Sequence, residues 1–494
     1  MDVRFIDTTF RDGSQSLWAM GMRTGMMEAV ASDMDRVGFD AIEVPVIGIF
    51  VKKFIRDLKE DFWEMARMMA RKMPVTVKSG FAGAFILPFE LATPRSVIEL
   101  FYSHLIRVGA INRVMITCNT FDQVERALPW IVPFFKNQGM QVALALSYTV
   151  SPRHTDAYYA QKTRDILQFA PDAIYLKDQG GLLTVDRVRT LLPVIVENAA
   201  GIPVELHSHC TTGLADLVYL EALNLGVATL HTAVPPLANG PSQPSVLNVA
   251  RNAEARGHST RLDKPLLRSI AARLTEFARQ DGLPIGAPVE YDYAQYLHQV
   301  PGGVISNLKH HLSELGIQHR LDEVLEEAIQ VRKDLGYPIM ITPLSQYVVT
   351  QSAINVAVGE RYKLVIDELI LFALGVFGVD SGFIEMEPNL RDRLLAMPRA
   401  AELAQRPTAT LSERELRERL GGPGLSDEDL LLRYVMKGEQ EIAAMRAAGP
   451  ARRYHSAGQP LSRLIDELGK SSSVRYVHIS RAKTSLAVEN RAVV

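Results

Sequence analysis

The sequence predicts an α/β protein, a (β/α)8 TIM barrel followed by a mainly helical C-terminal domain, and three observations lead to this prediction. Between residues 1 and 235, short runs with strand composition alternate with longer amphipathic helical patterns. Eight such runs are present, and eight strand–helix units favour closure of a parallel sheet into a barrel. From about residue 250 onward, helical patterns continue without strand-like runs. An open doubly wound sheet is the alternative, but the G-x-G-x-x-G sequence expected after its first strand is missing.

The order of these patterns predicts the elements one by one. The eight expected strands span 4–9, 41–46, 74–80, 112–118, 141–149, 173–179, 203–209 and 229–234. Expected helices between them include 25–37, 94–108, 151–169 and 213–225, and later ones are 264–281, 321–335, 345–358 and 363–374. A polar, breaker-rich stretch at 404–423 precedes one amphipathic helix at 426–447, and a further strand is expected at 474–480. We therefore expect a barrel catalytic domain at 1–300, a helical domain packing over the barrel mouth at 301–450, and a tail of unknown role at 451–494.

The composition is that of a soluble globular protein. Of 494 residues, 47% are hydrophobic and 22% charged, with a formal net charge of -2 and no basic stripe, so a nucleic-acid partner is not expected. The longest apolar stretch, near 369–379, contains two glycines and is shorter than the roughly 18 residues of a membrane span. The first residues lack the apolar core of a signal peptide. With only Cys118 and Cys210, a disulfide framework is excluded, and we expect a cytoplasmic protein.

Polar residues at the carboxyl ends of the expected strands are the candidates for chemistry, because barrel enzymes place their active sites there. His207 and His209 are two residues apart, and such positions share one face of a strand. Two histidines with a carboxylate suit a divalent transition metal, and Asp7 at the end of strand one is the expected carboxylate. The alternative is a pair of polar side chains satisfied by their neighbours.

Lys177 and Arg11 also lie at strand ends. Lys177 closes the apolar run AIYL, so its amine is expected in a partly buried mouth, where a lone charge is costly. A salt bridge to Asp178 or Asp7 is one interpretation, and a modified lysine that binds metal is the other; residue spacing does not distinguish them. Arg11 is suited to stabilise an oxyanion near a metal, or else pairs with Asp12 as a structural staple.

Six segments in order carry a resemblance to a known family: DTTFRDGSQSLWAMGMRT at 7–24, LKDQGGLLT at 176–184, HSHCTTG at 207–213, GPSQPS at 240–245, HQVPGGVISNL at 298–308 and ITPLSQYVV at 341–349. They resemble the carboxyltransferase components of biotin-dependent carboxylases, namely pyruvate carboxylase, the oxaloacetate decarboxylase alpha subunit and the transcarboxylase 5S subunit. The wider family of metal-dependent TIM barrels includes isopropylmalate synthase and hydroxymethylglutaryl lyase, which lack the K-D-x-x-G sequence of strand six. The resemblance extends over roughly residues 5–380.

The resemblance implies a metal-dependent enzyme and its ligands. Asp7, His207 and His209 would bind zinc, manganese or cobalt, and Lys177 would be the fourth ligand as an N-carboxylated lysine. Arg11 and Gln15 would lie beside the substrate, with Arg11, Gln15 and Lys177 as the catalytic residues. The reaction would move a carboxyl group between carboxybiotin and the enolate of a small carbonyl acid resembling pyruvate or oxaloacetate.

The resemblance also implies partners. Met436-Lys437 is followed by Gly438 rather than by a second methionine, so biotinylation of Lys437 is not expected. Biotin would arrive on a separate biotin carboxyl carrier protein that is loaded by a biotin carboxylase subunit. The expected assembly of the carboxyltransferase itself is a homodimer.

Several positions depart from the family pattern. Pro241 stands where the family has a proton-shuttling threonine, so Ser242 or Ser245 is the candidate replacement, and Ser242 is also an expected substrate contact. Cys210 follows His209 where the family has aspartate, and Gln346 replaces a lysine. The segment between strands two and three lacks the tryptophan- and glycine-rich sequence of the pyruvate site and its nearby arginine. We therefore expect a remodelled pocket and a different carboxyl acceptor.

Two other functions remain open at this stage. A biotin-independent metal-dependent aldolase or lyase on the same barrel fits the missing threonine. A catalytically silent scaffold subunit is the third alternative, although the joint presence of Asp7, Lys177, His207 and His209 argues against it, since each is costly to hold at a barrel mouth without a metal.

Overall fold

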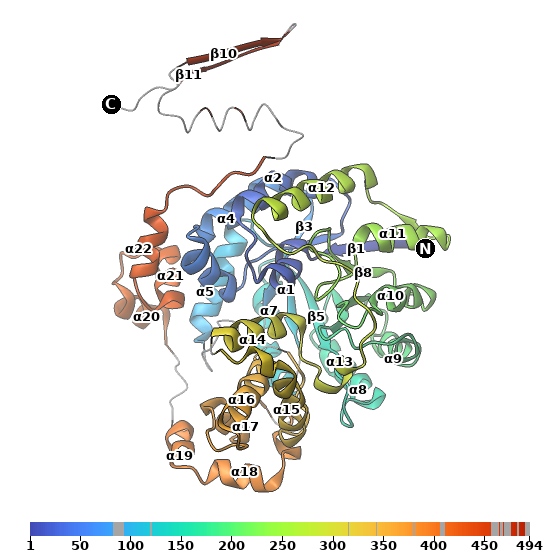
Figure 1. The fold of residues 1–494 in the computed structure, drawn as a ribbon, viewed down its shortest axis with the longest axis vertical. Helices are drawn as coiled ribbons and strands as arrows, with labels where there is room; N and C mark the ends of the chain where they lie inside the picture. The colour runs from blue at the N-terminus through green and yellow to red at the C-terminus, as the bar shows by residue number, and fades with distance from the viewer. Residues whose placement is uncertain are drawn as a thin grey trace.

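The computed structural model contains a closed barrel of eight parallel strands surrounded by helices (Figure 1). The structure describes residues 1–82, 93–118, 121–314, 316–341, 343–378, 381–405, 411–455, 464, 468, 476–481 and 484–489. The strands are β1 (Asp2–Asp7), β2 (Ala41–Glu43), β3 (Val77–Ala82), β4 (Arg113–Thr117), β5 (Gln141–Ser147), β6 (Ala173–Asp178), β7 (Val204–Ser208) and β8 (Thr229–Thr232). All eight strand predictions are thus confirmed, with ends that shift by up to three residues.

Closure of the sheet distinguishes this barrel from the open alternative. β1 pairs with β8, where Asp7 is opposite Thr232, and also with β2, where Asp7 is opposite Ile42. Each other strand pairs with its sequence neighbours, so the order runs from β2 through β8 and back to β1. A two-residue strand, β9 (Ser259–Thr260), extends the sheet beside β1 at the amino end. The register places Lys177 of β6 directly opposite His207 of β7, which fixes the two side chains at one level.

Helices around the barrel bury one apolar face each against the strands. Several of them begin where a polar side chain accepts a hydrogen bond from a free backbone N–H group, as Thr155 and Thr184 do. The main barrel helices are α2 (Thr24–Met34), α4 (Phe62–Lys72), α5 (Arg95–Arg107), α7 (Leu128–Lys136), α8 (Asp156–Leu167), α9 (Val185–Asn198), α10 (Ala215–Asn224), α11 (Val246–Ala255) and α12 (Lys264–Gln280).

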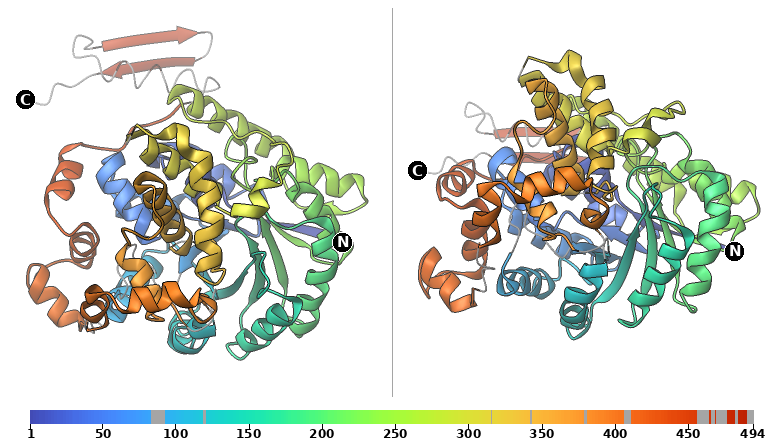
Figure 2. Two further views of the ribbon diagram at one scale, coloured as in Figure 1. Left: turned by 60° about the horizontal axis from the view of Figure 1, so that its bottom comes forward. Right: turned by 90° about the horizontal axis from the view of Figure 1, so that it is seen from below.

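A second apolar cluster starts at Val300 and gathers the next group of helices. These are α14 (Gly302–Glu314), α15 (Leu321–Asp334), α16 (Leu344–Val358), α17 (Asp367–Ala373), α18 (Pro388–Leu395) and α19 (Pro398–Ala404). The group lies across the carboxyl end of the barrel (Figure 2). Arg332 of α15 donates to Thr149 Oγ1, 3.1 Å away beyond the end of β5, and the short helix α13 (Ala294–His298) leads into the group.

The last helices pack elsewhere, against the outer wall of the barrel. Leu416, Leu430 and Ile442 belong to the barrel's own apolar cluster. The helices are α20 (Glu413–Leu420), α21 (Asp427–Met436) and α22 (Gln440–Ala447), which contact α3 (Gly48–Lys52), α5 and the π-helical turn Lys53–Leu58.

Two local predictions in this region are wrong. The single helix expected at 426–447 is broken at Lys437, which ends α21 in the left-handed conformation with φ 56°. The breaker-rich stretch at 404–423 contains α20, because Ser412 and Glu415 form a reciprocal capping box that starts a helix in a polar sequence.

The tail contains an antiparallel hairpin of β10 (Tyr476–Arg481) and β11 (Thr484–Glu489), in which Ile479 is paired with Leu486. The expected strand at 474–480 is therefore confirmed for its described residues. Within the described parts of the chain, every helix is too short or too polar to span a membrane.

Candidate active site

Four side chains from three parts of the barrel meet at its carboxyl end. His207 belongs to β7, His209 follows it, Lys177 belongs to β6, and Asp12 lies in the π-helical turn Thr9–Gly13 after β1. All four are buried, and the imidazole rings of His207 and His209 lie with centroids 5.1 Å apart. The prediction that these two histidines share one face is confirmed.

Asp12 is the centre of this cluster. Its Oδ2 lies 3.5 Å from Lys177 Nζ and 3.5 Å from His207 Nε2, and its Oδ1 lies 3.7 Å from His209 Nε2. Burial by itself raises the pKa of Asp12, but the positive charges of Arg11 and Lys177 outweigh it and hold that pKa well below the usual range. Asp12 is therefore a buried carboxylate at neutral pH.

Both imidazoles offer a lone pair toward this carboxylate. His209 Nδ1 is 2.6 Å from the Pro241 carbonyl oxygen, which only accepts, so Nδ1 carries the proton and Nε2 the lone pair. Gln243 Nε2 lies 3.0 Å from His209 Nε2 and 3.3 Å from His207 Nε2. Thr8 Oγ1 donates to Gln243 Oε1 at 2.6 Å, which turns the Gln243 amide N–H groups toward the two rings. The Nε2 lone pairs of both imidazoles thus point toward the Gln243 amide N–H groups. Lone pairs that converge on one place are what a cation site requires.

Burial favours the neutral forms of the two imidazoles. It lowers the pKa of His207 far below its ordinary value, with the charge of Lys177 acting in the same direction, and burial also lowers the pKa of His209. Burial lowers the pKa of Lys177 as well, against the pull of Asp12. One carboxylate, two neutral imidazoles and an amine of reduced basicity form a donor set that suits a divalent transition metal, and the ligand atoms of Asp12, His207 and His209 lie within 4.8 Å of one another.

Arg11 is held beside the cluster by two carboxylates. Its Nη1 lies 2.9 Å from Asp12 Oδ2 and its Nη2 lies 2.5 Å from Glu43 Oε2 at the end of β2. The guanidinium and the Lys177 amine both lie 5.5 Å from the centre of the Phe81 ring. The expected pair of Arg11 with Asp12 is therefore present, and the same pair fixes the guanidinium at the cluster.

The structure does not bring Asp7 into the cluster. The Thr9 hydroxyl donates to Asp7 Oδ1 at 2.5 Å, and the Thr9 N–H donates to Oδ2 at 3.1 Å. Burial raises the pKa of Asp7 to about 8, so this carboxyl group is largely neutral at pH 7. Asp12, expected from the sequence only as a partner of Arg11, occupies the place that was expected for Asp7.

The other expected substrate residues lie nearby. Gln15 is half-buried in α1 (Ser14–Trp18), one helical turn beyond Asp12. Ser242 is fully buried and its Oγ donates to Gln243 Oε1 at 3.2 Å, so the hydroxyl is held by the residue that contacts both histidines.

The sequence does not single out Gln243, Glu43 or a row of buried groups behind His207. Glu205 and His207 occupy alternate positions of β7, and His209 continues the same spacing just beyond its end, so this spacing alone places Glu205 on the same face as His207. Gln243 lies inside the segment GPSQPS, but nothing in its spacing separates it from the two serines.

Asp178 and Cys210 are both buried, and Asp178 is hydrogen-bonded to neighbouring backbone and side-chain groups. The Asp178 carboxylate accepts hydrogen bonds at 2.8 Å from the backbone N–H groups of Leu182 and Leu183 and from Ser208 Oγ. Burial raises the pKa of Asp178 to about 6 despite these bonds. Cys210 is buried, and its burial raises the pKa of its thiol well above the ordinary value.

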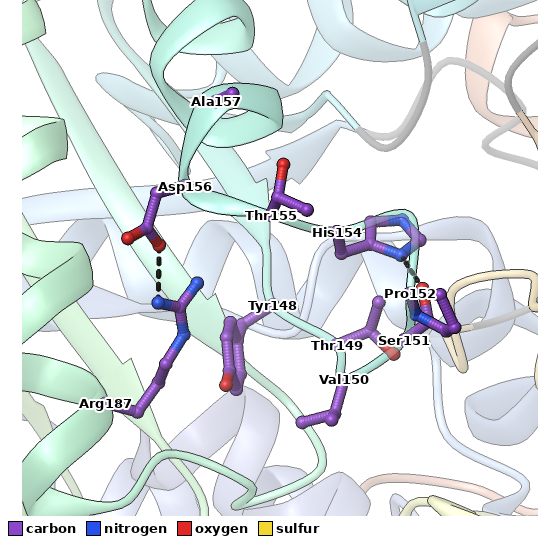
Figure 3. Close-up of a pocket in the computed structure, with 10 residues that line it drawn as sticks. All are labelled: Tyr148, Thr149, Val150, Ser151, Pro152, His154, Thr155, Asp156, Ala157 and Arg187. Carbon is purple, nitrogen blue, oxygen red and sulfur yellow. Dashed lines mark hydrogen bonds and ion pairs between the residues drawn. The ribbon is translucent and has the colours of Figure 1, made fainter.

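A hollow opens one strand away from Lys177, between the segment after β5 and the start of α9 (Figure 3). Arg187 pairs with Asp156 on one side of it, and Ser151 lies 2.6 Å from His154 on the other. The backbone N–H of Tyr148 donates to the Lys177 carbonyl at 2.7 Å, which ties the wall of the hollow to the strand that carries the lysine. None of the lining residues belongs to the four-residue cluster.

Two family models match the chain and divide it as the fold does. An HMGL-like model matches residues 2–273, more than half of the chain, and a conserved carboxylase domain model matches residues 296–446. The carboxyl transferase domain of Rhizobium etli pyruvate carboxylase, in a structure with oxamate and biotin, superposes with a TM-score of 0.78 at 22% identity. That match covers 90% of this chain and 77% of the other, and at this identity it supports the fold.

Similarity to curated proteins indicates which group of HMGL-like barrels this chain resembles. One pyruvate carboxylase subunit, from Methanocaldococcus jannaschii, is 34% identical over 396 residues, covering 80% of this chain and 68% of the relative. The 2-oxoglutarate carboxylase large subunit of Hydrogenobacter thermophilus is 31% identical over 87% of this chain and 66% of the relative. The methylmalonyl-CoA carboxyltransferase 5S subunit of Propionibacterium freudenreichii is 28% identical, covering 87% and 85%. Among the HMGL-like barrels, this chain therefore belongs to the carboxyltransferase family of the biotin-dependent carboxylases.

Proposed function

We propose that this chain is the carboxyltransferase subunit of a biotin-dependent carboxylase or decarboxylase, moving a carboxyl group between carboxybiotin and a small carbonyl acid. The buried cluster of Asp12, Lys177, His207 and His209 carries this proposal. Such a set of unlike charges and neutral donors is expensive to bury unless it binds something. Its place at the carboxyl end of the strands is where barrel enzymes act.

Asp12, His207 and His209 are the proposed protein ligands of a divalent ion, of which zinc, manganese and cobalt suit the donor set. Bound there, such an ion supplies Lewis-acid polarisation of a carbonyl group. Lys177 completes the site as an N-carboxylated lysine. A carbamate forms on the neutral amine, and the reduced basicity of the buried Lys177 supports this modification.

The remaining residues act on the substrate. Arg11 is fixed by Asp12 and Glu43, so its charge is already oriented to stabilise the negative oxygen that develops as the carboxyl group leaves. Gln15 and Ser242 are proposed substrate contacts because both lie next to this group in the fold. The acceptor belongs to the carbonyl acids, the class to which the names of the relatives, pyruvate and 2-oxoglutarate carboxylases, point.

The partners follow from the reaction. Lys437 ends a helix in a left-handed turn, whereas biotin carriers present their lysine on a β-domain, so we assign biotin to a separate carrier protein. A biotin carboxylase subunit would load that carrier, and the subunit proposed here would work as a homodimer in the cytoplasm.

Pro241 favours a second candidate, a biotin-independent lyase. Its carbonyl accepts from His209, so this residue is at the site, and its side chain provides no hydroxyl for proton transfer to biotin. The neighbouring Ser242 hydroxyl is bonded to Gln243.

Release of the carboxyl group separates these functions. Metal-loaded protein would be offered a panel of 2-oxo and 3-oxo diacids, oxaloacetate included, with and without free biotin. We expect turnover of at least one acid that biotin stimulates and that Lys177→Ala abolishes. Lys264→Ala, which removes a lysine paired with Glu254 on the barrel's outer surface, is the matched control and should keep full activity. Turnover at the same rate with and without biotin would establish the biotin-independent lyase. A protein that turns over none of the acids and binds no metal would establish the catalytically silent scaffold subunit.

A further inference from the structure

A row of buried groups runs from His207 away from the proposed metal, through the inside of the barrel. His207 Nδ1 lies 3.2 Å from His231 Nδ1 on β8, and His231 Nε2 lies 3.0 Å from Glu205 Oε2 on β7. Arg113 Nη2 on β4 donates to both Glu205 oxygens, at 2.8 and 2.7 Å. All four side chains are 9% exposed or less, so each contact is made away from solvent.

The chemistry of these groups fixes the direction of each hydrogen bond. Arg113 only donates, and Glu205 only accepts when ionised. Arg113 donates to both Glu205 oxygens and forms a buried ion pair with them, so Glu205 is the ionised acceptor of this row. His231 must therefore carry its proton on Nε2, facing Glu205. Its Nδ1 is left as an acceptor, and the facing Nδ1 of His207 must be the donor.

The proton on His207 Nδ1 also determines the state of Nε2, the nitrogen that faces Asp12. A neutral imidazole with its proton on Nδ1 has its lone pair on Nε2, and that nitrogen lies 3.5 Å from Asp12. We propose that His231, oriented by Glu205 and Arg113, is a positioning residue that holds His207 in the tautomer able to bind the metal ion. This inference rests on the metal site proposed above and assigns a role to three residues that contact no metal.

A competing use of the same groups is a cation between His207, His231 and Glu43. Their ligand atoms also lie within 4.8 Å of one another. However, Glu43 is engaged by Arg11 at 2.5 Å, and its Oε1 lies 3.9 Å from His231 Nδ1. The row of directed hydrogen bonds accounts for the close approach of the two Nδ1 atoms without a second ion.

We call the row of hydrogen bonds from Arg113 through Glu205 and His231 to His207 the relay. Three variants test whether it holds the tautomer of His207. His231→Phe removes both ring nitrogens and leaves the Nδ1 of His207 without its acceptor. His231→Gln restores an acceptor toward His207 and a donor toward Glu205. Glu205→Gln keeps the shape of the side chain but reverses its hydrogen bond to His231. The amide oxygen accepts from Arg113, so the amide N–H faces His231 as a donor. Tyr175→Phe is the matched control, since the Tyr175 ring lies 4.9 Å from that of His231 while its hydroxyl has no hydrogen-bond partner among the described residues.

The readout is metal binding to the full-length protein rather than turnover. Each purified variant is stripped with chelator and titrated with Co²⁺, and its dissociation constant, stoichiometry and visible d–d spectrum are recorded. We expect one ion per wild-type chain, binding about 10- to 100-fold weaker in His231→Phe and Glu205→Gln with an altered spectrum, and recovery toward wild type in His231→Gln. Tyr175→Phe should stay within about twofold of wild type. His231→Phe and His231→Gln keep the test decisive if Glu205→Gln, which strands the Arg113 charge, fails to fold.

The outcomes separate the two proposals. Unchanged affinity and spectrum in His231→Phe, with one ion still bound, would overturn the relay and leave the metal site intact. Two ions per wild-type chain, one of them lost in His231→Phe, would also overturn it and establish the His207–His231–Glu43 cation. A wild-type protein that binds no ion would overturn the metal site and the relay with it.

Discussion

Lys177 Nζ lies 3.5 Å from Asp12 Oδ2, although 165 residues separate the two along the chain. The contact joins the turn after the first strand to the end of the sixth, and both side chains are buried. Because this contact, with two imidazole lone pairs facing it, involves Asp12 and not Asp7, we propose Asp12 as the carboxylate ligand of the site.

Exchange of each aspartate for asparagine separates these two residues. Asp12→Asn removes the only carboxylate among the proposed metal contacts, so we expect metal affinity to fall by at least about 100-fold and turnover to be lost. Asp7→Asn replaces a carboxyl group that is already largely neutral at pH 7, so metal content should stay near that of wild type. Metal analysis after dialysis measures both. Loss of metal in Asp7→Asn with retention in Asp12→Asn would reverse the assignment.

Asp178 should matter for stability rather than for metal binding. Its two oxygens accept from Leu182, Leu183 and Ser208, and an asparagine has only one acceptor oxygen. Asp178→Asn would leave at least one buried N–H group unpaired, so we expect a loss of about 1–3 kcal/mol in the free energy of unfolding. Denaturant unfolding followed by circular dichroism gives this value, and an unchanged midpoint would contradict the role.

The two cysteines should be inert in the folded protein. Burial raises the pKa of the Cys118 thiol to about 12 and that of the Cys210 thiol well above its usual value, so almost no thiolate exists at pH 8. A chromogenic disulfide reagent should therefore react with neither thiol until denaturant is added, and with both afterwards. Rapid labelling of Cys210 in the native protein would show that the segment after β7 opens.

Ionised Glu205 should make the free energy of unfolding depend on pH in the acidic range. Its pKa falls from an ordinary 4.5 to about 2 in the folded protein, so its contribution is fully present above pH 4.5 and is lost as pH falls through about 2. The difference in unfolding free energy between wild type and Glu205→Gln, no more than about 3 kcal/mol from this source, should shrink between pH 5 and pH 3. A difference that stays constant over this range would show that Glu205 is not the titrating group.

The sequence predicts the barrel well because alternation of strands and helices is a local property. The run AIYL at 173–176, for example, is apolar on both faces, as expected of a buried parallel strand, and it forms the first part of β6. The spacing of His207 and His209 also predicts their common face, since strand geometry repeats every two residues.

Other parts of the site depend on features that the sequence does not express. Asp12 reaches the cluster through a π-helical turn, which brings residue 12 rather than residue 7 to the histidines. His231 and Arg113 face Glu205 from two other strands, and only barrel closure and register bring them together. The break at Lys437 is hidden in the sequence because a left-handed lysine leaves the apolar spacing on both sides intact.

A crystal structure of metal-loaded protein, with anomalous data collected at the metal's absorption edge, tests the central claim most directly. We expect a single anomalous peak within bonding distance of Asp12, His207 Nε2 and His209 Nε2, with density for a carboxyl group extending from Lys177 Nζ to the same ion. A peak bonded to Asp7, a peak between His207 and His231, or no peak in the barrel mouth would contradict it.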